Sequence, residues 1–130
     1  MTQAYRHFNT FMGDPVRALI TATQNDVIKR DGLTEHAATV GDYLENQLVT
    51  LQGKNPEWIS NVRGRGTFLA FDVAKGPAAR DKLVTTLKQH GVNAGVCGSQ
   101  TFRLRPSLYF GEKHADILTA ALADSIKKLN

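Results

Sequence analysis

The apolar residues of this chain change their spacing after Pro56, and no other feature of the sequence constrains its fold as strongly. Before Pro56 they recur at helical spacing, for example at Val40, Leu44, Leu48 and Leu51. From residue 67 to residue 73, apolar and other residues alternate as in a β-strand. The change predicts a helical arm over residues 1–56 and a domain that contains strands over residues 57–130.

Two helices are expected in the arm. Asp14 and Pro15 mark the start of the first, because Asp is a favoured N-cap and Pro fits the first helical position. We expect this helix to end at Gly32, and a second helix, capped by Thr34, to end at Gly53.

The second part is expected to contain strands and helices in mixed order. The ranges are a strand at 67–73, a helix at 77–90, strands at 92–96 and 101–105, and a helix at 113–129. This order predicts an α+β fold, with a small, mainly antiparallel sheet covered on one face by helices.

Composition excludes several classes of protein. No apolar stretch is long enough to cross a membrane, and the histidines show no metal-ligand spacing. The single cysteine cannot form an internal disulfide, which favours a reducing compartment, either the cytoplasm or the mitochondrial matrix. The net charge of +4 is spread along the chain, apart from a concentration of arginines in residues 63–65 and 103–105.

The most informative of these arginines are Arg103 and Arg105, which precede Pro106. Alternation on a strand would place both side chains on one face, and the planar guanidinium group suits a carboxylate or a phosphate. The alternative, that both are exposed or paired with acidic side chains, remains open at this point.

Two other segments could bind an anion. In residues 62–66, Gly64 and Gly66 would let backbone amides approach an anion, or would form a turn into the strand. Asn9 and Thr10 lie just before the first helix, where a phosphate could bind or where the two side chains could cap the helix.

Nucleic-acid binding has little support. Residues 65–71 have the basic residue and glycine that begin an RNA-recognition strand, but Thr67 and Leu69 occupy the positions where stacking rings are expected.

Together, residues 6–15, 62–68 and 102–108 resemble the class III pyridoxal-phosphate-dependent aminotransferases, and within them the 4-aminobutyrate branch. The resemblance covers nearly the whole chain. It implies the C-terminal small domain of a fold type I enzyme, which works as a homodimer with a large cofactor domain. The implied reaction transfers an amino group from 4-aminobutyrate to 2-oxoglutarate.

The resemblance also implies roles for individual residues. Thr10 would contact the phosphate of pyridoxal phosphate across the dimer interface, and Arg105 would hold the carboxylate of the amino-acid or 2-oxo-acid substrate. Arg103 matches the motif but would not touch the substrate. The Schiff-base lysine has no counterpart, because the family places it before the Asn-Thr segment and the first lysine here is Lys29.

We therefore expect no catalytic residue in this chain, no cofactor bound by the chain alone and no activity without the parent's large domain and second subunit. The chain alone is also expected to self-associate through apolar surface. The alternative is a stand-alone, non-enzymatic protein that binds an anionic ligand or a nucleic acid and keeps the domain fold.

Overall fold

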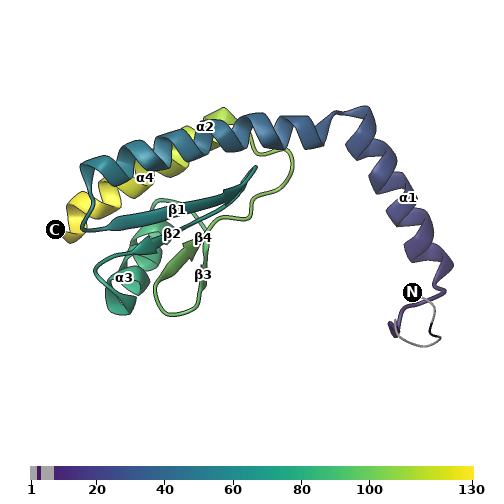
Figure 1. Cartoon of the computed structure of the whole chain (residues 1–130), viewed down its shortest axis with the longest axis horizontal. Helices are drawn as coiled ribbons and strands as arrows, with labels where there is room; N and C mark the ends of the chain where they lie inside the picture. Colours follow the sequence, from purple (N-terminus) through teal and green to yellow (C-terminus); the bar gives the residue numbers. More distant parts are fainter. Residues whose placement is uncertain (1–2, 4–7) are drawn as a thin grey trace. The chain divides into compact units, whose positions relative to one another are not determined.

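The computed structural model of the chain describes residue 3 and residues 8–130, and it divides into two compact units (Figure 1). The first unit extends to Leu33 and the second runs from Thr34 to Asn130. The expected division of the parent protein at residue 56 stays a prediction.

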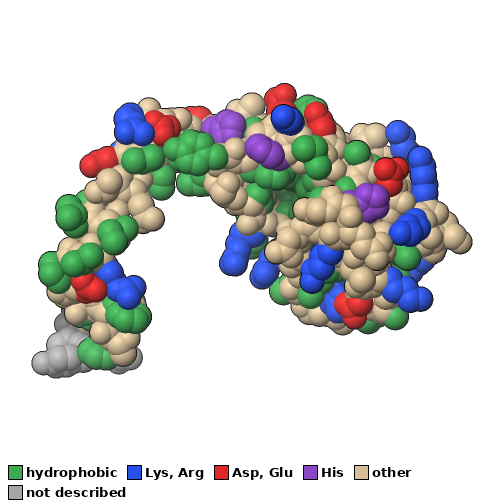
Figure 2. Space-filling view, turned by 180° about the vertical axis from the view of Figure 1, so that it is seen from behind, with side chains coloured by type: hydrophobic (Ala, Val, Ile, Leu, Met, Phe, Trp, Pro, Cys, Tyr) green, Lys and Arg blue, Asp and Glu red, His purple; other side chains and the backbone are tan. Residues whose placement is uncertain are grey.

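The described residues of the first unit include the helix α1, from Pro15 to Arg30. As predicted, Asp14 is its N-cap, and the Asp14 carboxylate accepts hydrogen bonds from the backbone amides of Val16, at 2.9 Å, and Arg17, at 3.2 Å. No residue of α1 is buried, and apolar side chains gather along its surface (Figure 2). Local capping therefore defines where this helix begins, with no contribution from core packing.

The second unit is an antiparallel sheet with three helices, which confirms the predicted α+β class. Its strands lie in the order β1-β2-β4-β3. The elements, in chain order, are α2 (Leu33–Lys54), β1 (Ile59–Arg65), β2 (Phe68–Val73), α3 (Pro77–Gln89), β3 (Gly95–Cys97), β4 (Thr101–Arg103) and α4 (Glu112–Leu129).

One face of the sheet forms the core together with the helices. Leu69, Phe71 and Phe102 point to this face and are almost fully buried, and the rings of Phe71 and Phe102 stack at 4.8 Å. The helices supply residues that include Leu44 and Leu48 from α2, Leu83 and Leu87 from α3, and Leu118, Leu122 and Ile126 from α4. The opposite face carries polar side chains such as Asp72, as the alternation in the sequence predicted.

Strand β1 was not predicted, because residues 62–66 were expected either to approach an anion with their backbone amides or to form a turn into the next strand. Arg63 and Arg65 both lie in β1, and Gly66 alone of these residues lies in the turn that follows it. The register shifts between Ser60 and Arg63, and Asn61 has a φ of 52°. This bulge interrupts the alternation by which a strand is recognised.

Three predicted boundaries were also wrong. Thr34 lies inside α2 and does not cap it, and β4 ends at Arg103, so that Arg105 follows the strand. Strand β3 is shorter than predicted because α3 ends in a Schellman motif, in which the Val92 amide donates to the Leu87 carbonyl at 3.0 Å. Residues before Gly95 therefore complete the helix end and do not pair with β4.

Two glycines bring α2 into direct contact with the turn between β1 and β2. A Cβ atom on Gly41 would lie 2.2 Å from the carbonyl carbon of Gly66, which is far inside contact distance. Gly66 has a φ of +55°, a conformation that glycine adopts without strain. The helix and the turn can thus pack backbone against backbone.

Replacing Gly41 with alanine should therefore destabilise the protein by about 1–3 kcal/mol, the usual cost of overpacking. Gly53→Ala is the matched control, since Gly53 also lies in α2 and a Cβ there meets nothing within 4 Å. The control should stabilise the helix by roughly 0.5–1 kcal/mol. Urea unfolding measures both changes, and equal effects of the two substitutions would refute the proposed contact.

Candidate functional site

A cavity of about 420 Å³ lies where β4 ends, between the segment that leads into β3 and the start of α4. Arg103 and Arg105 both line it, together with His114 of α4. No Asp or Glu is among the described residues that line this cavity. Its charged groups are therefore arginines, which is the composition expected of an anion site.

Arg103 is the more deeply placed of the two arginines. Its Nε atom is buried and has no hydrogen-bond partner among the described residues. Gly95 pairs with Arg103 across the sheet, and a Cβ atom on Gly95 would lie 3.1 Å from Nη2 of Arg103. The absence of a side chain at Gly95 thus leaves the space that the guanidinium group occupies.

Arg105 lies beyond the end of β4 and is exposed. It lines the same cavity as Arg103, and none of the described residues forms a recorded hydrogen bond or ion pair with its side chain. The two arginines therefore reach one cavity, although the predicted continuous strand that was to place them on one face is not present.

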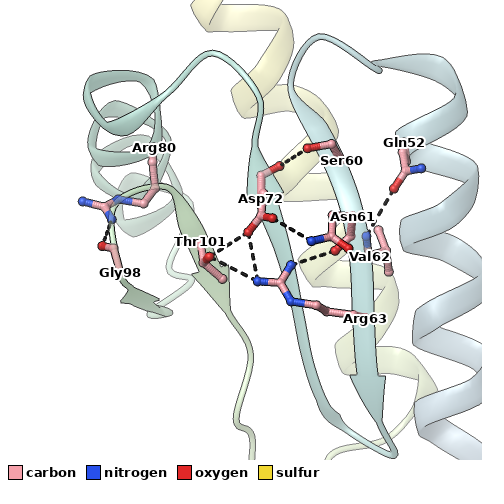
Figure 3. A network of polar contacts seen from close by, with 9 residues as sticks. All are labelled: Gln52, Ser60, Asn61, Val62, Arg63, Asp72, Arg80, Gly98 and Thr101. Atoms are coloured by element: carbon pink, nitrogen blue, oxygen red, sulfur yellow. Dashed lines mark hydrogen bonds and ion pairs between the residues drawn. The ribbon is translucent and has the colours of Figure 1, made fainter.

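Arg63, one of the two arginines in residues 62–66, is held in a network on the open face of the sheet (Figure 3). Its Nη2 atom lies 3.0 Å from Oδ1 of Asp72, and its Nη1 donates to the Asn61 carbonyl at 2.8 Å. Asp72 also accepts from the Thr101 hydroxyl at 2.6 Å and from the Asn61 side-chain amide at 2.8 Å. This network ties β1, β2 and β4 together and neutralises Arg63.

The network also sets the ionisation of Asp72. Partial burial raises the pKa of this carboxyl group. Hydrogen bonds from Thr101, Asn61 and Arg63, together with the charge of Arg63, lower the pKa by more than burial raises it, so that the net shift is downward. Asp72 is therefore held as a carboxylate over a wider pH range than an isolated aspartate.

Thr10 is exposed and lies in a turn ahead of α1, in the first unit, whereas residues of the second unit build the cavity. Asn9 stabilises the turn by accepting from the Phe11 amide at 2.8 Å. The backbone amides of Val16 and Arg17, at the start of α1, already donate to the Asp14 carboxylate. The negative charge of Asp14 would oppose a phosphate at this end of the helix. Arg6 and His7 of the same motif lie outside the described residues.

His114 was not predicted as a site residue, and Arg103 was expected not to touch the substrate. Both line the cavity. The Nδ1 atom of His114 accepts the Gly111 amide at 3.0 Å, so that a neutral ring carries its proton on Nε2. Only the position of His114 near the start of a helix could have been known from the sequence.

Among residue 3 and residues 8–130, no group of three or more His, Cys, Asp or Glu side chains could hold a metal ion. In the same part of the chain, no helix is both long enough and apolar enough to cross a membrane. Cys97 is a free, exposed thiol.

The Asp72 network predicts how stability depends on pH. Because the folded-state pKa of Asp72 is lowered, the ionised carboxylate contributes stability above the ordinary pKa of about 3.9, and this contribution is lost as the pH falls through the folded-state pKa. Asp72→Asn should therefore lower the free energy of unfolding near pH 7, and the difference from wild type should shrink below about pH 4.

Asp124→Asn serves as the control for this measurement, because Asp124 is an exposed residue of α4 with no recorded ion pair. Urea unfolding at a series of pH values compares the three proteins. A difference between wild type and Asp72→Asn that stays constant from pH 7 to about pH 3 would contradict the network.

Comparison with known proteins identifies the family. The sequence model of the family described as aminotransferase class III matches residues 1–126 of this chain. The chain is 48% identical over 129 residues to 4-aminobutyrate aminotransferase of Kluyveromyces lactis, and the aligned residues make up 98% of this chain and 27% of the relative. It is 41% identical over 120 residues to the mitochondrial 4-aminobutyrate aminotransferase of Sus scrofa, covering 92% of this chain and 24% of that protein.

Solved structures agree with this assignment. Lysine aminotransferase of M. tuberculosis superposes on this chain with a TM-score of 0.78 and 32% sequence identity. The superposed region covers 81% of this chain and 24% of the lysine aminotransferase chain. Ornithine aminotransferase of Plasmodium yoelii, at 22% identity and a TM-score of 0.84 over 98% of this chain, supports the fold alone. The chain spans about a quarter of the length of the curated relatives it matches, and it belongs to the class III aminotransferases.

Proposed function

We propose that this chain is the carboxylate-binding part of a 4-aminobutyrate:2-oxoglutarate aminotransferase. The observation that carries the proposal is the buried Nε atom of Arg103, which has no partner among the described residues; Arg103 and Arg105 line one cavity, and no described residue of its lining is acidic. The names of the relatives supply the reaction, and the arginines supply the chemistry that it requires.

A buried donor without an acceptor destabilises a protein by about 1–3 kcal/mol. A carboxylate bound in the cavity would accept from Arg103 and remove this cost, and its charge would offset the repulsion between the two guanidinium groups. We assign the substrate carboxylate to Arg103 together with Arg105, which extends the role expected of Arg105 alone.

The residues of this chain do not make a complete site for pyridoxal phosphate. None of its lysines lines the cavity, and Lys29, the first of them, lies on α1 in the other unit. Thr10 offers a hydroxyl group for the phosphate, but the neighbouring Asp14 occupies the helix amides. We therefore propose that the cofactor belongs to the longer parent and that the chain alone does not catalyse transamination.

The partners and the compartment are part of the same proposal. The parent would supply a large domain and a second subunit, with Thr10 contacting the cofactor phosphate across the dimer interface. Its location would be the cytoplasm, or alternatively the mitochondrial matrix; the name of the Sus scrofa relative describes that protein as mitochondrial. Exposed apolar residues on α1, such as Leu19 at 69% exposure, favour self-association of the chain alone.

The second candidate function is a stand-alone protein that binds an anionic ligand. It is favoured by the position of the cavity, which residues of the second unit alone line. Such a protein would bind a carboxylate without any part of the cofactor machinery.

A first experiment tests the absence of catalysis. The purified chain is mixed with pyridoxal phosphate, reduced with borohydride and analysed by mass spectrometry, with the Saccharomyces cerevisiae 4-aminobutyrate aminotransferase treated in parallel. We expect the relative to carry one specifically labelled lysine, and this chain to show only scattered, substoichiometric labelling. Stoichiometric labelling of a single lysine, with turnover of 4-aminobutyrate, would overturn the proposal.

A second experiment tests the arginines in the chain itself. Binding of the dicarboxylate glutarate is measured by calorimetry for wild type and for Arg103→Gln and Arg105→Gln. Loss of a charge-assisted hydrogen bond costs about 1.5–3 kcal/mol, so the Arg103 variant should bind on the order of ten- to a hundredfold more weakly. The exposed Arg105 should contribute less, because its charge is better screened by solvent.

Arg65→Gln removes the same charge at an exposed arginine of β1 that does not line the cavity. It should leave glutarate binding unchanged within the error of the measurement. If all three substitutions weaken binding equally, the anion responds to net charge alone and the assigned site does not exist.

A further inference from the structure

The open face of the sheet, opposite the core, carries arginines from both strands that flank β2. Arg63 of β1 and Arg103 of β4 both pair with Ala70 of β2, so that they lie on either side of it. Residues that pair directly across strands share a face, and Ala70 offers only a methyl group between the two arginines. Figure 3 looks onto this face, with Arg63 drawn in front of the strands.

A second row of residues lies two positions further along the strands. On one side of β2, Arg65 of β1 pairs with Phe68. On the other side, the Leu104 amide donates to the Leu69 carbonyl at 2.8 Å, so that the chain stays beside β2 past the end of β4. The next residue in this register is Arg105, which comes next to Phe68. The backbone thus brings an arginine to each side of one phenylalanine.

The side chain of Phe68 is a free aromatic surface on the open face. It is 58% exposed, and the burial of β2 alternates from it, so that Leu69 and Phe71 point into the core while Phe68 points away. No ring stacking and no cation–π contact is recorded for Phe68 within the part of the chain that the structure describes. A flat ligand group can therefore reach the ring.

This position of the ring changes the expectation about nucleic acids. Nucleic-acid binding had little support because Thr67 and Leu69 occupy the positions where stacking rings were expected. Both of these residues are buried, and Leu69 belongs to the core. The open face instead receives Phe68 and Ala70. The face that a base could approach therefore does carry a ring.

We propose that the open face of the sheet binds a single-stranded nucleic acid, with a base stacked on Phe68 and phosphates at Arg65 and Arg105. The inference goes beyond the proposed function and does not rest on it, since neither Phe68 nor Arg65 lines the cavity. It requires neither the cofactor nor the large domain of the parent.

The charges of this face are complementary to such a strand. Arg65 forms no recorded ion pair with the described residues, and Asp72, the acidic residue among the paired positions of this face, is already neutralised by Arg63. A nucleic-acid strand carries a phosphate at every nucleotide and a base with a π-face, which suits arginines on both sides of a ring. An acidic peptide or a lipid surface would supply anions but no base to stack on Phe68.

A single strand is favoured over a duplex because its bases are accessible. In a duplex each base is stacked and paired, and bringing one to Phe68 would require its extrusion, which costs free energy. The bases of a single strand can turn outward and stack on a protein ring without this cost. The exposed ring therefore selects the class of nucleic acid.

The contribution of the arginines is tested by the dependence of binding on salt. Fluorescein-labelled oligothymidylate of about twelve nucleotides, within the usual range of such sites, is titrated with the full chain and followed by anisotropy. Each phosphate contact contributes about −0.7 to the slope of log binding constant against log salt, so Arg65→Gln should weaken binding and make the slope shallower by about 0.7. Lys82→Gln, at an exposed residue of α3, removes the same charge outside this face and should leave the slope unchanged.

The contribution of the ring is tested with an abasic strand of the same length and charge. The wild-type chain should bind oligothymidylate about tenfold more tightly than the abasic strand, the usual gain from one stacked base. Phe68→Leu keeps an apolar side chain and should remove most of this difference. Phe11→Leu is the matched control, because Phe11 is 57% exposed but its ring already faces the Arg17 guanidinium at 3.8 Å.

Each result supports or overturns the proposal. Equal binding of oligothymidylate and the abasic strand overturns it, as does equally tight binding of polyglutamate of the same charge, which would indicate a response to charge alone. Glutarate is titrated into Phe68→Leu in parallel and should bind as it does to wild type. Glutarate binding without oligothymidylate binding removes the open-face site and leaves the carboxylate site, whereas the reverse result removes the carboxylate site and supports the one proposed here.

Discussion

The backbone contact between Gly41 and Gly66 is the constraint on which the arrangement of the second unit depends. No side chain fits between α2 and the β1–β2 turn, because a Cβ atom on Gly41 would lie 2.2 Å from the backbone of Gly66. The helix therefore fixes the turn, the turn fixes the pairing of β1 with β2, and β2 pairs in its turn with β4, which carries Arg103. A contact between two residues without side chains is thus connected to Arg103 through two strand pairings.

How much of this fold can be predicted depends on whether each element follows a regular pattern. The helices and β2 were predicted because their apolar residues repeat regularly and their ends carry Asp14, Pro15 and glycines. β1 was missed because Asn61 and the register shift beside it break the alternation. The start of β3 is set by the local cap at the end of α3, where Gly91 and Val92 follow the helix. The end of β4 coincides with the end of its pairing with β3 at Gly95, which is a tertiary effect.

The candidate site shows the same division between local and tertiary information. Residue types alone pointed to an anion at the arginine motifs, but they could not say which arginines were available for it. Arg63 is neutralised because Asp72 lies on the neighbouring strand with Thr101 next to it. Arg103 keeps a buried, unpartnered Nε atom because Gly95 lies opposite on β3. Cross-strand register decides both outcomes, and register is set by the fold and not by the motif.

This distribution of contacts also separates the two residues first expected to bind ligands. Thr10 lies in an exposed turn of the first unit, just ahead of the capped start of α1. Arg105 shares with Arg103 a cavity that the second unit builds from its own strands and helices. The carboxylate recognition that we propose would therefore need only contacts within this unit, because register, glycine spacing and the Asp72 network are all internal to it. The proposed division of labour follows: the cofactor would depend on groups of the longer parent, and the acid on contacts inside this unit.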